Sequence, residues 1–241
     1  MLFDRPVSGR TLHDDEKRRL GNQPRMSFQG ILASAAPSKE TVVTVGVFDG
    51  VHQGHRHLLR QVVESAGSQY IPTVVTFSNR PITVLNPGTE PSYLTTVDQR
   101  VDLIKQQGIE LVVSLEFTLE LAQVTAEDFS KLLAGPLKMK GLVLGPDSAL
   151  GKDRQGDLEF MQKQGEQLGF WARSVEPLEI EGQPVKSRRI REAVANGNMA
   201  ACPELLGRNH HLSGKVVVGD QRGRTLGFPT ANIDVDDQLL L

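Results

Sequence analysis

Short apolar runs alternate with amphipathic stretches along most of the chain. Residues 41–48 form a continuous run rich in β-branched side chains, which is typical of a strand buried on both faces of a sheet. Comparable runs predict further strands at 71–77, 111–117, 142–145 and 170–175. Apolar residues at helical spacing predict helices from Arg56 to a stop at Gly67, from a cap at Thr95 to 107, and at 126–133, 158–168, 189–196 and 200–206.

Strands that alternate with helices predict right-handed β-α-β crossovers and a mainly parallel sheet with helices on both faces. The sequence therefore predicts an α/β fold. In open sheets of this kind, ligands bind outside the carboxyl ends of the strands. The segment that follows the 41–48 strand lies at such an end, so its side chains are the first candidates for function.

The two ends of the chain follow different patterns. Residues 1–25 are polar and unpatterned, which predicts a mobile arm, and Met26 is an alternative start. Beyond Gly207 the sequence is punctuated by glycine and proline between short apolar runs, as at the beginning of a β-rich unit. Two or three strands rarely bury enough surface to be stable alone. We therefore expect the chain to stop inside a domain, either as a fragment or as a natural truncation.

Composition narrows the classes of protein without selecting one. The chain has 241 residues, 39% of them hydrophobic, and a net charge of −2, which does not favour binding to nucleic acid or to a membrane surface. Its one cysteine, Cys202, cannot form an internal disulfide, and no apolar run approaches the roughly 20 residues of a membrane span. The N-terminus lacks the apolar core of a secretory signal. These features predict a cytoplasmic protein and leave its oligomeric state open.

The segment VGVFDGVHQGH, which begins inside the first strand, has the features of a phosphate-binding turn. Gly46 and Gly50 allow the backbone to turn tightly and to approach a ligand. The helix that follows offers unpaired backbone N–H groups at its positive end, where anions bind. His52 and His55 can reach the same anion and donate hydrogen bonds to phosphoryl oxygens. Asp49 is placed to hold the turn or to orient a histidine, whereas the side chain of His57 points elsewhere on the helix.

Two other interpretations of the histidines stay open. Two imidazoles can share a zinc ion, but zinc needs a third or fourth ligand, and the H-E-x-x-H arrangement is absent. The histidines can also be ordinary polar residues at the start of a capped helix. Other phosphate signatures do not match: G-x-G-x-x-G is absent after the first strand, and GPDSALGKD has Asp153 where a P-loop has Ser or Thr.

VGVFDGVHQGH resembles the H-x-G-H nucleotidyltransferase signature of the prokaryotic bifunctional riboflavin kinase/FAD synthetase family. Four further segments resemble that family in the same order, from about residue 42 to the end. They are the βα unit at 93–133, GPDSALGKDRQGD at 145–157, VKSRRIREAVANGNMAACPELLGR at 185–208 and GKVVVGDQRGRTLGFPTANI at 214–233. The resemblance implies a Rossmann-like nucleotidyltransferase domain at 26–203, after the arm at 1–25, and the start of a β-barrel riboflavin kinase domain at 204–241.

The resemblance also implies a reaction, the transfer of AMP from ATP to FMN to give FAD and pyrophosphate with help from Mg²⁺. His52 and His55 would stabilise the transferring phosphate, and Ser187 and Arg191 would bind the triphosphate. The other residues that the resemblance assigns to the substrate pocket are Gly46, Val47, Phe48, Asp49, Gly50, Asp147, Arg154 and Arg189.

In the full family the second domain phosphorylates riboflavin to FMN. The resemblance implies that Thr230 and Asn232, in the P-T-A-N tetrad, approach Mg²⁺ and the ATP phosphates. The family's catalytic glutamate lies beyond residue 241. We therefore expect no phosphorylation of riboflavin by these 241 residues.

Several positions differ from the family pattern where substrates are expected. Arg80 stands in place of a histidine, and Ser148 and Leu150 stand in place of two aromatic residues. Lys186 and Arg188 replace a serine and a threonine, so long cations stand where short hydroxyl groups are usual. Two alternatives to FMN adenylyl transfer stay open: a catalytically impaired nucleotide- or flavin-binding protein, and an H-x-G-H nucleotidyltransferase with another acceptor. The kinase-like segment argues against the second.

Four cations gather at the start of the helix expected at 189–196. Positive charge at the N-terminus of a helix opposes the helix dipole, so an anion is expected to offset it. The plain alternative is a solvated helix start with no ligand. The four residues are Lys186, Arg188, Arg189 and Arg191.

Overall fold

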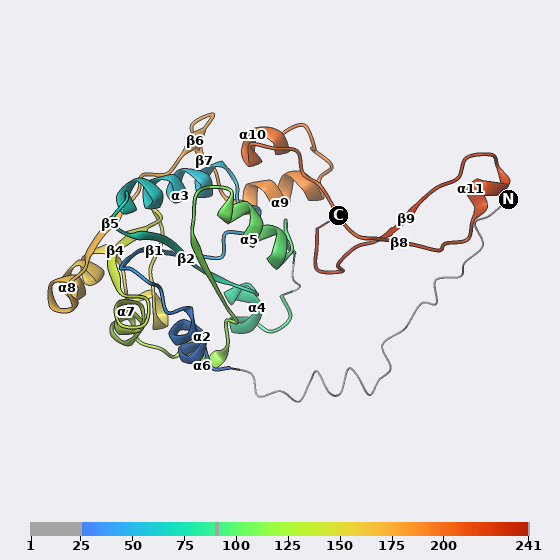
Figure 1. Ribbon diagram of the computed structural model, residues 1–241. Helices are drawn as coiled ribbons and strands as arrows, with labels where there is room; N and C mark the ends of the chain where they lie inside the picture. The colour runs from blue at the N-terminus through green and yellow to red at the C-terminus, as the bar shows by residue number, and fades with distance from the viewer. Residues whose placement is uncertain (1–25, 90–91, 241) are drawn as a thin grey trace.

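The computed structural model describes residues 26–89 and 92–240 (Figure 1). Five strands form one parallel sheet in the order β3-β2-β1-β4-β5. This order, which reverses direction between β1 and β4, is that of a Rossmann-like doubly wound sheet. The expected α/β fold is therefore confirmed. The strands are β1 (Thr41–Val45), β2 (Ile71–Phe77), β3 (Leu111–Leu115), β4 (Met139–Leu144) and β5 (Trp171–Ser174).

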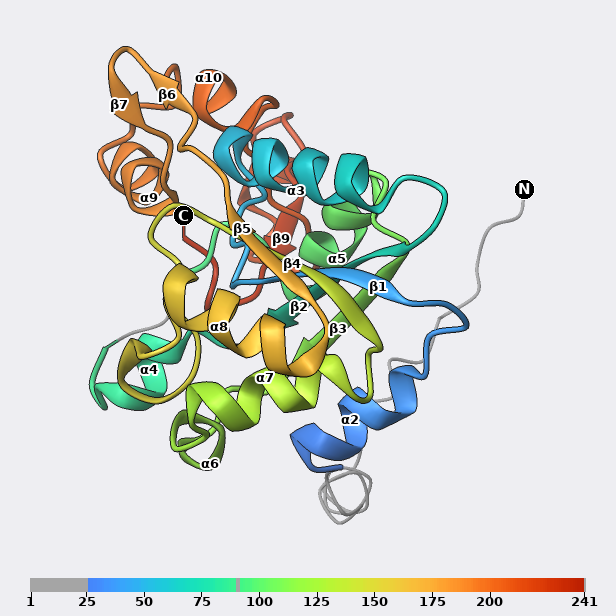
Figure 2. The same cartoon turned by 90° about the vertical axis from the view of Figure 1, so that its left-hand side faces the viewer.

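Helices cover both faces of this sheet (Figure 2). One face carries α3 (Gln53–Ala66) and α5 (Val97–Lys105). The opposite face carries α2 (Phe28–Ala35), α6 (Leu119–Ala122), α7 (Ala126–Ala134) and α8 (Leu158–Leu168). The short helices α4 (Pro81–Leu85) and η1 (Lys152–Arg154) lie in the connections that follow β2 and β4.

The central strand β1 directs alternate side chains into two apolar layers. Val43 packs in one core cluster with Leu133 of α7 and Met161 of α8. Val42 packs in the other cluster with Leu59 of α3. All five residues of β1 are buried, as the continuous apolar run predicts for a strand covered on both faces.

The predicted boundaries around β1 are wrong by several residues. The strand expected at 41–48 ends at Val45, and the first residue beyond it with a positive φ is Phe48. The helix expected to begin at Arg56 begins one turn earlier, at Gln53. The sequence pattern marked only the apolar stripe of the helix, whereas its polar first turn faces the site described below.

Two further differences concern short elements. The helix expected to be capped by Thr95 is capped by Thr96, whose Oγ1 accepts a hydrogen bond from the N–H of Gln99 at 3.2 Å. The sequence patterns also missed α2, α4, α6 and the hairpin of β6 (Glu179–Ile180) and β7 (Gln183–Pro184). The helices α4 and α6 have five and four residues and the two hairpin strands two each, too few to show a period. The helix α2 has eight residues, with Phe28 and Leu32 buried at helical spacing, so its pattern was present in the sequence. Residues 1–25, expected to form an arm, lie outside the described residues.

The chain leaves the sheet through α9 (Ser187–Ala195) and α10 (Cys202–Leu206), close to the expected helices. It then forms an antiparallel hairpin of β8 (Lys215–Val217) and β9 (Asn232–Asp234), with α11 (Arg222–Thr225) near its tip. This C-terminal hairpin projects away from the sheet (Figure 1). No helix in the part of the chain that the structure describes is long and apolar enough to cross a membrane.

Candidate active site

The segment between β1 and α3 is a tight turn at the point where the strand order reverses. Gly50 has a φ of +79°, and a Cβ there would lie 2.8 Å from Cδ1 of Leu94. Phe48 and Val51 also have positive φ, 53° and 37°. Such angles are strained for bulky and β-branched residues. Both side chains are almost fully buried, so packing holds the turn in this conformation.

Asp49 fastens this turn to two other segments. Its Oδ1 accepts hydrogen bonds from the N–H of Leu94 at 2.9 Å and from the hydroxyl of Thr95 at 3.4 Å. Its Oδ2 pairs with Nη1 of Arg191 at 2.9 Å, with side-chain exposures of 3% for the aspartate and 17% for the arginine. The sequence left open whether Asp49 holds the turn or orients a histidine, and these contacts show that it holds the turn.

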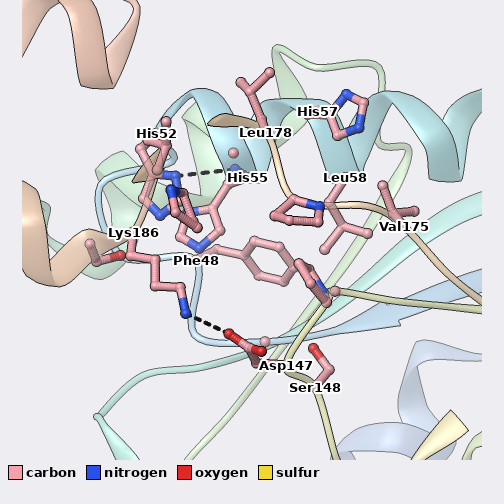
Figure 3. Close-up of a pocket in the computed structure, with 18 of the residues that line it drawn as sticks. Phe48, His52, His55, His57, Leu58, Asp147, Ser148, Val175, Leu178 and Lys186 are labelled. Atoms are coloured by element: carbon pink, nitrogen blue, oxygen red, sulfur yellow. Dashed lines mark hydrogen bonds and ion pairs between the residues drawn. The ribbon is translucent and has the colours of Figure 1, made fainter. Parts of the chain in front are cut away.

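The two histidines form one packed unit at the start of α3 (Figure 3). His52 is the N-cap, and its Nδ1 accepts a hydrogen bond from the backbone N–H of His55 at 3.2 Å. A neutral ring whose Nδ1 accepts carries its proton on Nε2. The two rings stack with centroids 3.6 Å apart, and Phe48 contacts His55 edge-on at 5.1 Å.

Both imidazoles are neutral at ordinary pH. Burial, followed by the positive charges of Arg191 and Arg208, lowers the pKa of His52 to about 3. Burial, followed by His52, Arg100 and Arg191, lowers the pKa of His55 well below its ordinary value. The pair therefore offers N–H donors without formal charge, and the positive field around them comes from the arginines.

Gly54, between the histidines, lets a distant segment reach them. A Cβ at Gly54 would lie 2.8 Å from the backbone oxygen of Val185. Because Gly54 has no side chain, the segment that leads into α9 can pack against the first turn of α3. Ser187, at the start of α9, donates a hydrogen bond from its hydroxyl to the backbone oxygen of Asp49 at 3.0 Å.

The four cations at the start of α9 each face a carboxylate of the protein. The pairs of Lys186 and Arg188 are mostly exposed on both sides, and pairs of that kind add little stability. Protein carboxylates thus already offset the charge for which the sequence predicted an anion. The pairs are Lys186–Asp147 at 2.5 Å, Arg188–Glu192 at 2.8 Å, Arg189–Glu181 at 3.1 Å and Arg191–Asp49 at 2.9 Å.

Two cavities meet at the carboxyl ends of β1 and β4. The histidine cavity, about 310 Å³, is lined among others by His52, His55, Asp147, Lys186 and Ser187 (Figure 3). The aromatic cavity, about 720 Å³, has apolar walls that include Phe77, Phe117, Leu121, Phe129 and Leu150. Residues 45–47 and 147–148 border both cavities. Molecules in the two cavities would therefore meet beside Asp147.

The structure brings most of the expected site residues to these cavities. Gly50, Arg189 and Arg191 line neither cavity. Gly50 and Arg191 make hydrogen bonds that hold the turn, and Arg189 donates to the backbone oxygen of Ile180. His57 contributes to the wall of the histidine cavity at a place apart from the stacked pair of His52 and His55 (Figure 3). The expected residues that line a cavity are Gly46, Val47, Phe48, His52, His55, Asp147 and Ser187 for the histidine cavity and Arg154 for the aromatic cavity.

Thr230 and Asn232 lie elsewhere in the molecule. Both are exposed on the C-terminal hairpin and line neither cavity. Among residues 26–89 and 92–240, no group of three or more His, Cys, Asp or Glu side chains is arranged to hold a metal ion.

Sequence reasoning missed one residue that shapes the site. Arg208 donates from Nη2 to the backbone oxygen of Gly50 at 2.7 Å and from Nη1 to that of Val51 at 3.4 Å. It satisfies carbonyls that the tight turn leaves unpaired. No local pattern marks an arginine that contacts a turn 157 residues away.

A five-stranded parallel sheet with a tight turn after β1 and two adjoining cavities at its carboxyl edge defines an α/β protein of the Rossmann-like class. Comparison with known families specifies it further. The family model described as FAD synthetase matches residues 34–189, and the model described as riboflavin kinase matches residues 206–241. The chain belongs to the bifunctional riboflavin kinase/FAD synthetase family.

Individual relatives agree with this assignment. The chain is 36% identical over 208 residues to the bifunctional riboflavin kinase/FMN adenylyltransferase of Escherichia coli K12, covering 86% of this chain and 66% of the relative. The protein of the same name from Pseudomonas fluorescens is 34% identical over 196 residues, covering 80% and 63%. The chain thus spans just under two thirds of the length of these relatives.

A solved structure has the same fold. It is titled a macrolide-efflux protein from Streptococcus pneumoniae and is 31% identical. The superposition has a TM-score of 0.77 and covers 84% of this chain and 66% of that protein.

Proposed function

We propose that this chain is an FMN adenylyltransferase, which transfers AMP from ATP to FMN and releases pyrophosphate. The observation that carries the proposal is the pair of cavities that share the carboxyl ends of β1 and β4. A transfer between two substrates requires two binding sites whose reactive ends meet. The domain division at 26–203 and 204–241 is part of this proposal.

The two cavities suit different parts of the substrates. The histidine cavity carries N–H, hydroxyl and ammonium donors from His52, Ser187 and Lys186, which suit a triphosphate. The aromatic cavity has Phe77 and Phe117 among its walls, which suit a flat apolar ring such as the flavin. ATP therefore belongs in the first cavity and FMN in the second.

The residues of this chain act by positioning and by charge stabilisation. A phosphate oxygen of FMN attacks the α-phosphorus of ATP, and the bond from that phosphorus to the bridging oxygen breaks, so its electron pair leaves with pyrophosphate. The N–H groups of His52 and His55 would stabilise the charge that develops on the transferring phosphate. Arg191, whose Nη1 donates a hydrogen bond to Oδ2 of Asp49, adds positive potential near the two histidines.

Asp147 is the side chain best placed for Mg²⁺. Mg²⁺ is usually held by one or two carboxylates together with substrate phosphates, and Asp147 is a carboxylate on the wall that both cavities share. Its pKa is held below the ordinary value by Lys186, so it is ionised. The metal would neutralise the triphosphate. Thr230 and Asn232 remain proposed ligands for the kinase reaction of the longer family members.

Two differences from the family fall on these walls and bear on the acceptor. Ser148 and Leu150 line the aromatic cavity where the family has aromatic residues, yet Phe77, Phe117 and Phe129 supply aromatic surface there. This favours retention of flavin binding over an impaired or different acceptor site.

Calorimetry with the 241-residue chain tests the two-site proposal. An ATP analogue with a methylene group between the α- and β-phosphates should bind with and without FMN present, and FMN should bind with and without the analogue. Phe117→Ser should weaken FMN binding alone, and Lys186→Met should weaken analogue binding alone. Mutual exclusion of the two ligands would contradict the proposal.

A further inference from the structure

Arg208 holds the turn between β1 and α3 at a strained residue. Its Nη2 donates to the backbone oxygen of Gly50 at 2.7 Å, and its Nη1 donates to that of Val51 at 3.4 Å. These two oxygens belong to the peptide groups on either side of Val51, whose φ is 37°. A strained backbone of this kind persists only where its surroundings hold it. Arg208 therefore helps to fix both peptide groups that flank Val51.

The direction of Arg208 is set by the residue before it. Gly207 ends α10 with a φ of +68°, an angle that favours glycine, and so lets the chain reverse toward α3. Two side chains of α3 bind the same segment. Nε2 of Gln53 donates to the backbone oxygen of Glu204 at 3.3 Å, and Nη1 of Arg56 donates to that of Gly207 at 3.4 Å. The segment that carries Arg208 is thus packed against the start of α3.

The residue that follows Val51 is the first histidine of the candidate site. His52 caps α3 by accepting the N–H of His55 on its Nδ1 at 3.2 Å, and the two rings stack with centroids 3.6 Å apart. Both contacts depend on the peptide group between Val51 and His52, because a rotation of that group would carry the His52 ring away from the N–H that it caps. Burial, Arg191 and Arg208, in that order, also lower the pKa of His52.

We infer that Arg208 is a positioning residue for adenylyl transfer, because it holds the peptide group that orients His52 toward the transferring phosphate. This inference rests on the proposed function. Arg208 lines neither cavity, so it acts through the turn. It lies outside the match to FAD synthetase at 34–189 and inside the match to riboflavin kinase at 206–241. The adenylyl-transfer site therefore depends on a residue from the region that the riboflavin kinase model matches.

Steady-state kinetics of Arg208→Met in the full chain test this role. The kcat for FAD formation should fall by about 10- to 100-fold, because a small displacement of a catalytic group is costly. The KM for FMN should not change, since Arg208 lines neither cavity. A residue that only stabilised the fold would lower the Tm and leave kcat intact at temperatures well below it.

Arg208→Lys keeps the charge but offers one nitrogen where the guanidinium offers two. Its kcat should lie between that of Arg208→Met and that of the unmodified chain. This variant also decides the question if Arg208→Met fails to fold. A full rate in Arg208→Lys would overturn the inference, because the paired bonds to Gly50 and Val51 would then be dispensable.

Arg56→Met is the matched control. It removes an arginine that binds the same segment, at the backbone oxygen of Gly207, and that makes no hydrogen bond to the turn in the part of the chain that the structure describes. Its kcat should equal that of the unmodified chain. An equal fall in Arg56→Met and Arg208→Met would overturn the inference, because packing of the segment would then explain the effect.

Amide hydrogen exchange followed by NMR gives a readout that does not depend on FAD formation. The N–H of His55 lies in the first turn of α3 and donates to Nδ1 of His52. In Arg208→Met this amide should exchange roughly tenfold faster, whereas the amide of Val62, in the middle of the same helix, should keep its rate. An unchanged rate at His55, or an unchanged kcat in the folded variant, would overturn the inference. If the unmodified chain formed no FAD, the proposed function would fail, and the His55 amide would still decide whether Arg208 positions His52.

Discussion

At the scale of single residues, the candidate site depends on histidines that are held neutral. The Nδ1 of His52 accepts the hydrogen bond that caps α3, and the ring of His52 stacks on that of His55. Neither ring can therefore rotate freely. Their neighbours Arg191 and Arg208 supply the positive charge and also lower the pKa of His52. A site of this kind can donate hydrogen bonds to a phosphate across a broad range of pH.

His55→Ala should lower kcat for FAD formation by about 10²- to 10³-fold, as removal of one preorganised donor to a developing charge commonly does. Its folded state should persist, because α3 keeps its cap at His52. His211→Ala, an exposed histidine away from both cavities, is the matched control. An unchanged rate for His55→Ala would remove this residue from the mechanism.

Stability should fall as the pH is lowered through the range set by His52. Its pKa is about 3 in the folded chain and about 6.5 in the unfolded one, so the unfolded chain takes up the proton first. The contribution of neutral His52 to the free energy of unfolding is complete above pH 6.5 and declines as the pH falls toward 3. Between pH 7 and pH 5 the loss is about 2 kcal/mol by linkage. His52→Asn keeps an N-cap oxygen and should remove this part of the slope in urea unfolding. An unaltered slope would show that His52 is not held neutral by the fold.

At the scale of elements, the longer strands and helices could be predicted from the sequence, because their apolar runs or helical spacing extend over enough residues to be recognised. The turn between β1 and α3 could not be predicted, because Phe48 and Val51 are residue types typical of a strand. Their positive φ depends on the packing that buries both side chains. The histidine pair followed from spacing alone. Arg208 and Arg100 did not follow, because their roles come from contacts with distant backbone.

Gly54→Ala tests the approach of α9 to α3. The added Cβ would lie 2.8 Å from the backbone oxygen of Val185, so this segment and Ser187 must move. We expect a loss of about 1–3 kcal/mol in the free energy of unfolding and a weakened affinity for the ATP analogue. Arg60→Ala, on the exposed face of the same helix, should change neither. Full stability and affinity in Gly54→Ala would mean that the two segments are not in tight contact.

At the scale of the whole molecule, a sheet with two buried cores contrasts with an exposed C-terminal hairpin. Val216 is 73% exposed and Phe228 is 78% exposed, whereas the strands of the sheet are largely covered. The composition of the hairpin predicted an incomplete β-rich unit, and the riboflavin kinase model matches this region. Its apolar side chains have little to pack against among the described residues.

Brief digestion with trypsin should therefore cut first, within residues 26–240, after Lys215, Arg222 or Arg224, because these residues are exposed on the hairpin. The fragment that retains the sheet should keep its affinity for the ATP analogue. Mass spectrometry of the early fragments identifies the sites. Earlier cleavage within the sheet region, for example after Arg173, would contradict this order of stability.

The most direct test of the central claim is a chromatographic assay of the purified chain with ATP, FMN and Mg²⁺, with riboflavin run in parallel. The account predicts that FAD forms from FMN with one pyrophosphate released per FAD, and that riboflavin is not converted. Binding of both ATP and FMN without any FAD would contradict the claim, because both cavities would then be occupied without transfer between them.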